Sequence, residues 1–148
     1  TTGPRTISCL CNNLGISSGD ECMAFGWGGQ AAGLACALGV LRESSGRYYF
    51  GSLFSDDLIS DTVGGLVSLV MTVDSAKMQR LYINGKLAVS KAFTSTINTS
   101  AINGKIGAAP WNAAGWRGYI AQCRVYNRAL DADEVAALAS ELISENQS

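Results

Sequence analysis

Histidine is absent from this chain of 148 residues. Because histidine is the commonest general base and the commonest transition-metal ligand, its absence excludes a Ser-His-Asp triad and argues against a transition-metal centre. No apolar run is long enough to span a bilayer, and the formal net charge of -1 gives no positive field for nucleic acid. We therefore expect no membrane insertion, no nucleic-acid binding and no cofactor.

Prolines and charges are also scarce: the chain has two prolines and 16% charged residues against 47% hydrophobic residues. This composition is typical of a folded globule rather than of a disordered chain. Seventeen glycines suit a chain with many tight turns. At this length one hydrophobic core is sufficient, so we expect a single domain over residues 1–148.

Five cysteines are present: Cys9, Cys11, Cys22, Cys36 and Cys123. An odd number cannot be fully paired within one chain, and no two of them have the spacing of a zinc ribbon. All but Cys22 lie inside apolar, strand-like runs, where a thiol behaves as a small core side chain. The pattern favours mostly free, buried thiols and assembly in a reducing compartment, with a disulfide framework as the alternative.

The segment 117–127 alternates in a way that predicts a strand, with Tyr119, Ala121, Cys123 and Val125 on one face. After it, Asp131 and Glu134 have the spacing of a capping box, in which each side chain accepts a hydrogen bond from a free backbone amide of the first helical turn. We therefore predict a helix over about residues 131–143, followed by a frayed tail at 144–148.

Further short strands are expected along the chain, over residues 5–11, 22–27, 33–41, 47–53, 66–73, 78–83, 87–93 and 102–108. The pair Asn84-Gly85 between two of them is the signal of a type I′ hairpin turn. Trp27 is expected in a glycine-rich loop, and residues 55–65 in a long acidic loop. Many short strands before a single helix are typical of an antiparallel sandwich.

Three segments resemble the laminin G-like, concanavalin A-like β-sandwich modules. The run from Gly115 through Leu130 to the helix is similar to the closing strand of that family, although Ala121-Gln122 replaces its usual acidic pair. Residues 79–87 resemble its hairpin, and residues 5–10 its early strand, with Leu10 in place of the usual tryptophan. The resemblance implies an all-β, antiparallel two-sheet jelly roll with one short C-terminal helix.

Glycosidases of this fold carry paired carboxylates in a Glu-x-Asp-x-x-Glu run, because one group donates a proton while the other attacks or activates water. This sequence contains no such run. Its adjacent acidic pairs, Asp20-Glu21 and Asp56-Asp57, fall in expected loops and are interpreted as solvated charge. We therefore expect no enzymatic activity.

Sugar binding is the commonest role in the family, and sugar rings stack on aromatic side chains while amides contact their hydroxyl groups. The candidate ligand-binding residues are Trp27, Trp111, Asn112 and Trp116. The alternative for Trp111 and Trp116 is that they cover the end of the core.

Many relatives hold Ca²⁺ with loop oxygens, so Asp56, Asp57 and Asp61 are the candidate metal ligands here, without an EF-hand spacing to support them.

The sequence thus predicts a non-catalytic recognition or attachment module that binds glycans or a partner surface. The alternative is a structural decoration, cement or fibre protein of a virion or another surface assembly, and both place it outside the cell or on a virion surface. Relatives usually carry strands ahead of the segment at residues 5–10, so the closing strand should have an open edge. We expect a homo-oligomer or a docked module, unless the loop at 55–65 supplies the missing strand.

Overall fold

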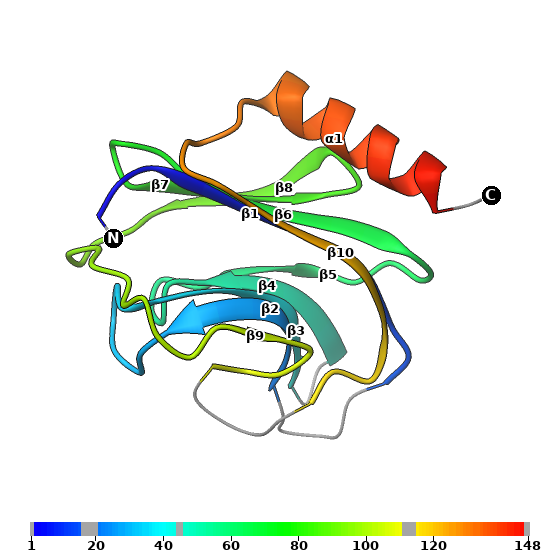
Figure 1. The fold of residues 1–148 in the computed structure, drawn as a ribbon, viewed down its shortest axis with the longest axis horizontal. Coiled ribbons are helices and arrows are strands. Elements are labelled where there is room, and N and C mark those ends of the chain that lie inside the picture. Colours follow the sequence, from blue (N-terminus) through cyan, green and yellow to red (C-terminus); the bar gives the residue numbers. More distant parts are fainter. Residues whose placement is uncertain (1, 16–20, 44–45, 111–114, 147–148) are drawn as a thin grey trace.

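The computed structural model describes residues 2–15, 21–43, 46–110 and 115–146. Two antiparallel sheets face each other and a single helix lies on the outer side of one of them (Figure 1). This arrangement confirms the predicted antiparallel two-sheet sandwich with a short C-terminal helix.

Sheet A has the strand order β10-β1-β6-β7-β8 and sheet B the order β5-β4-β3-β2-β9. The strands of sheet A are β1 (Arg5–Asn13), β6 (Val67–Val73), β7 (Met78–Ile83), β8 (Lys86–Ala92) and β10 (Gly118–Tyr126). Those of sheet B are β2 (Glu21–Gly28), β3 (Ala35–Glu43), β4 (Gly46–Ser52), β5 (Leu58–Asp61) and β9 (Lys105–Ile106). The helix α1 spans Ala132–Glu145.

The main core lies between the sheets, but sheet A is also covered on its outer face. There Leu10, Val70 and Tyr82 pack with side chains of α1 such as Leu138 and Leu142. Every residue of β6 is buried as a result, because alternate side chains point either into the sandwich or under the helix.

The helix begins as the sequence predicts. Asp131 is the N-cap, and the reciprocal hydrogen bonds of the capping box with Glu134 are both present. Arg128 donates to both carboxylate oxygens of Glu134 at 2.8 and 2.7 Å, which lowers the pKa of Glu134 to about 2. The helix continues through Glu145, so the predicted tail from residue 144 begins too early. In the described ranges, no helix combines the length and the apolar character that a membrane crossing needs.

The hairpin turn between β7 and β8 is also confirmed. Asn84 and Gly85 both have positive φ, at 51° and 80°, as a type I′ turn requires. A Cβ atom on Gly85 would lie 3.0 Å from the Cα of Ala136 in α1. Glycine therefore serves both the turn and the close approach of the helix.

The segment 55–65 contains a strand that the sequence pattern did not predict. Residues 58–61 form β5, which pairs with β4 at the edge of sheet B and lies near β7 and β8 of the facing sheet. The strand therefore does not supply a partner for β10. Within the described residues β10 pairs only with β1, so the open edge expected for the closing strand is present.

A β-bulge changes which side chains of β10 face the core. Leu10 pairs with Gln122 and Cys11 with Ile120, so Ala121 has no partner in β1. The expectation that Ala121 shares the face of Cys123 is wrong, because Ile120 takes that inward place and packs against the core with Cys123. One extra residue in a strand reverses the alternation beyond it.

The connection from β10 to α1 is fixed by a buried hydroxyl on the first strand. Thr6 Oγ1 donates to the carbonyl of Arg128 and accepts from the amide of Leu130, both at 2.9 Å. Thr6 is fully buried, so losing the hydroxyl would leave two backbone groups without a partner.

We predict that Thr6→Val lowers the free energy of unfolding by about 1–3 kcal/mol, because it keeps the shape but removes both hydrogen bonds. Thr6→Ser retains the hydroxyl and should cost much less. Urea unfolding followed by circular dichroism measures both. Equal losses in the two variants would contradict the assignment.

Candidate functional site

A largely apolar cleft of about 640 Å³ opens between the two sheets. One wall comes from the start of β1 and the end of β10, and Trp27 of β2 contributes from the other sheet. The described residues that line it are Gly3, Pro4, Arg5, Trp27, Val125, Tyr126 and Asn127. At one edge of sheet B, β5 lies near β7 and β8 of sheet A. The opposite edge strands, β9 of sheet B and β10 of sheet A, therefore lie together on the other side of the sandwich. The cleft opens on that side.

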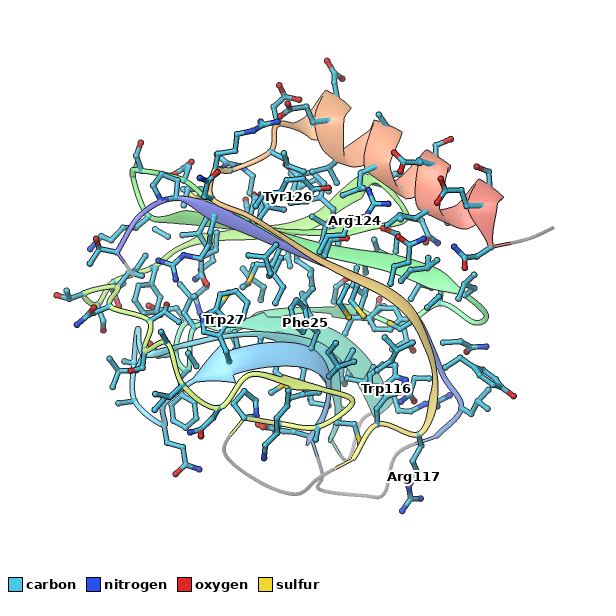
Figure 2. The ribbon with its side chains drawn as sticks, viewed as in Figure 1. Phe25, Trp27, Trp116, Arg117, Arg124 and Tyr126 are labelled. Carbon is cyan, nitrogen blue, oxygen red and sulfur yellow. The ribbon has the colours of Figure 1, made fainter. Side chains whose placement is uncertain are left out.

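Trp27 lies near the end of β2 rather than in the glycine-rich loop predicted for it. A register shift between Met23 and Phe25 turns Phe25 and Trp27 toward the interior, where both pack partly buried against the core. Their ring centroids are 5.9 Å apart with the planes tilted by 53°. Figure 2 shows both side chains between the sheets, and Trp27 is half-buried and contributes to the wall of the cleft.

Arg5 is part of the cleft wall, but its guanidinium contacts the protein itself. It donates to the carbonyl of Gly3 at 3.1 and 3.0 Å and to the hydroxyl of Thr99 at 2.5 Å. The side chain is buried, and this burial lowers its pKa from the usual value. Arg5 therefore ties the N-terminal segment and the segment around Thr99 to the first strand.

The β10 side of the cleft is formed by Val125, Tyr126 and Asn127. Val125 is 53% exposed although it follows the inward-facing Cys123 on the same face of the strand. It is exposed because β10 is the last strand of sheet A. Tyr126 instead packs against the cluster beneath α1. Among the described lining residues, Trp27 is therefore the aromatic side chain that lies between the sheets.

The other predicted sugar-binding residues do not join Trp27. Trp116 packs against the core, and its indole N–H is buried without an acceptor among the described residues. Figure 2 shows Trp116 well apart from Trp27, which fits the alternative that it covers the end of the core. Trp111 and Asn112 lie outside the described residues.

The three candidate calcium ligands have separate surroundings. Asp56 accepts hydrogen bonds from the amide and hydroxyl of Thr94 at 2.9 and 2.7 Å, and these bonds lower its pKa. Asp57 accepts from the hydroxyl of Ser52 at 2.6 Å, and Asp61 is exposed on β5. Nowhere in the described ranges do three acidic or thiol side chains form a group that could hold a metal ion.

None of the described residues that line the cleft is a carboxylate, whereas glycoside hydrolysis needs two carboxyl groups. Its volume, apolar walls and partly exposed indole are typical of a site for a small ligand.

The sequence pattern identified Trp27 but not Arg5, Val125 or Asn127. The pairing of β1 with β10 brings those three residues together. The closing-strand motif was the sequence signal that could have indicated this pairing.

The chain matches a known family. The model of the concanavalin A-like lectin/glucanases superfamily matches residues 14–136. A search of curated proteins finds no sequence match.

Solved structures share the fold at low sequence identity. The chain is similar to domain 4 of an extracellular arabinanase from Geobacillus stearothermophilus, solved with arabinotriose, at 17% identity and a TM-score of 0.65, covering 94% of this chain and 68% of that one. It is also similar to the CBM40 of the Ruminococcus gnavus IT-sialidase, at 14% identity and a TM-score of 0.71, covering 94% and 84%. A Trypanosoma rangeli sialidase matches at 13% identity and a TM-score of 0.64, covering 96% of this chain but 23% of that protein.

We predict that calcium does not stabilise the fold, because Asp56 and Asp57 already accept hydrogen bonds from the protein. Calcium chloride at about 5 mM, above the dissociation constants of typical extracellular calcium modules, should shift the melting temperature by less than about 1 °C relative to a chelator. Differential scanning fluorimetry with magnesium as the control measures this. A clear rise with calcium alone would restore the predicted metal site.

Proposed function

This chain belongs to the concanavalin A-like lectin/glucanase superfamily, and we propose that it is a non-catalytic recognition module that binds glycans in the cleft beside Trp27. The observation that carries the proposal is the half-buried indole of Trp27 at an apolar cleft of about 640 Å³. The apolar face of a sugar ring stacks on an aromatic ring, and an apolar cleft with a few polar groups is the usual form of a small-ligand site.

Packing and hydrogen bonds hold the described walls of the cleft in place, which favours binding. Trp27 packs against Phe25 and the core. Val125 belongs to β10, which is hydrogen-bonded to β1. Arg5 fixes Gly3 through two hydrogen bonds. A preformed site loses little conformational entropy when a ligand binds.

Proteins with similar structures support a glycan as the ligand. The arabinanase domain was solved in complex with arabinotriose, and the sialidase CBM40 was solved with sialyllactose. Those identities are 17% and 18%, so the ligands themselves are not transferred to this chain, and the proposal extends only to glycans as a class.

The positions of the acidic residues support a module without catalysis. The cleft has no carboxylate in its described lining, and Asp56 and Asp57 are engaged by Thr94 and Ser52 outside it. Glycoside hydrolysis needs two carboxyl groups across the scissile bond.

A second function, attachment to a protein surface, is favoured by the open edge of β10. Tyr119 is 67% exposed and Val125 53% exposed on this strand. Arg124 is held by Glu141 of the helix at 3.1 Å, so it does little to protect the edge. An uncovered strand edge pairs readily with another strand. We propose that the module works as an oligomer or docked on a larger extracellular or virion surface.

We predict that Trp27→Ala weakens glycan binding at least about 10-fold, through the loss of about 1.4 kcal/mol of stacking and apolar contact. The wild-type chain is first screened on a glycan array that includes arabino-oligosaccharides and sialyllactose. The best ligand is then titrated by calorimetry.

Tyr119→Ala is the matched control, since it removes an exposed aromatic ring from β10 outside the cleft. It should leave the affinity unchanged, and Trp27→Phe should retain part of it. The proposal fails if the array shows no bound glycan, or if Trp27→Ala binds as tightly as the wild type while remaining folded.

We predict that the isolated chain self-associates with rising concentration in analytical ultracentrifugation. Ala121→Lys places a charge at the exposed bulge of β10 and should reduce the association, because charge on an edge strand opposes pairing. Ala88→Lys, an exposed position on the opposite edge strand β8, is the control. A monomer at every concentration would refute self-association.

A further inference from the structure

Two thiols face each other across the first and last strands of sheet A. Cys9 of β1 and Cys123 of β10 are direct partners in the antiparallel register, and the Cys123 thiol donates to the Cys9 sulfur at 3.6 Å. We infer that Cys9 and Cys123 form a disulfide when the module meets an oxidising environment, and that this bond cross-links the edge strand β10 to β1.

The backbone already has the separation that a disulfide needs. Partners in an antiparallel pair have Cα atoms about 4.5–5.5 Å apart, within the range of about 4.4–6.8 Å found across disulfides. Closing the bond therefore requires the two sulfurs to approach through side-chain rotation and not through movement of a strand.

The remaining cysteines lack such a partner in the strand pairings. The bulge places Ile120 opposite Cys11, while Cys22 pairs with Val40. Cys36 is opposite Trp27. None of the five cysteines is in a disulfide in the structure, and four are buried. Cys123 is the exception, since it is half-buried on the edge strand and is the thiol that a reagent can reach.

The reaction balances with a disulfide reagent such as oxidised glutathione. The Cys123 thiolate attacks one sulfur of the reagent, forms a mixed disulfide and releases one glutathione thiolate. The Cys9 thiolate then attacks the Cys123 sulfur and displaces the second glutathione. Two protein thiols are oxidised to one disulfide, and one molecule of oxidised glutathione is reduced to two thiols.

The surroundings of the two thiols set the rate of this reaction. The pKa of Cys123 is raised by its hydrogen bond with Cys9 and by burial, and the pKa of Cys9 is raised as well, with Cys11 as the largest cause. Because the thiolate is the nucleophile, oxidation should be slow at neutral pH and faster in alkaline buffer.

The bond would join residues 114 positions apart in the sequence. A cross-link over so long a segment strongly restricts the unfolded chain. It would also fix β10 two residues before Val125, so the β10 wall of the glycan cleft would be held to β1. The bond forms whether or not the cleft binds a glycan.

The test uses the full chain, fully reduced and then incubated with oxidised glutathione at alkaline pH. Free thiols are alkylated, and trypsin followed by chymotrypsin gives peptides for mass spectrometry. Cleavage after Leu10 separates Cys9 from Cys11 and makes the assignment unambiguous. We expect the loss of two alkylated thiols, one linked pair of peptides containing Cys9 and Cys123, and a rise in melting temperature of about 10 °C.

Cys123→Ser should remove the linked peptides and the thermal shift, and Cys22→Ser should keep both. Five alkylated thiols after prolonged oxidation would overturn the inference. So would a bond to Cys11, Cys22 or Cys36, or a bond between two chains. Should Cys123→Ser not fold, the peptide map of the wild-type chain decides the question alone.

Discussion

The outer face of sheet A carries Leu10, Val70 and Tyr82, and α1 shields these side chains from water. Their burial requires that the chain turn back over the sheet directly after β10, and the hydroxyl of Thr6 holds that turn. The helix in turn approaches the hairpin at Gly85. The double burial of sheet A therefore fixes β1, β10 and α1 relative to one another, and with them one wall of the cleft.

Much of this fold could be predicted from local patterns. The capping box at Asp131, the turn at Asn84-Gly85 and most strands depend on neighbouring residues, and these predictions are confirmed. The bulge at Ala121 and the strand β5 depend on pairing with distant segments. Alternation along a single strand contains no information about an extra unpaired residue, so the face assigned to Ala121 was wrong.

The site was less predictable for the same reason. Trp27 was identified because sugar rings stack on aromatic side chains and its glycine-rich surroundings predicted a loop, yet its place in the wall of a cleft follows from a register shift in β2. Arg5 and Asn127 carry no local signal of a site, because the cleft exists only where the start of β1, the end of β10 and Trp27 of β2 come together. Trp116 has the same composition-based signal as Trp27, and both are partly buried against the core. Only Trp27 is among the described residues that line the cleft, and the sequence pattern does not contain that difference.

The pairing of β1 with β10 also constrains the order in which the protein can fold. Cys9 and Cys123 are neighbours in space but 114 residues apart in the chain. During synthesis, hairpins such as β7–β8 have both strands available early, whereas β1 must wait until most of the chain has emerged before β10 can cover it. Until then the apolar residues of β1 have an uncovered flank. Formation of the sheet is therefore expected to be a late and slow step, and nascent chains are most exposed to aggregation before it.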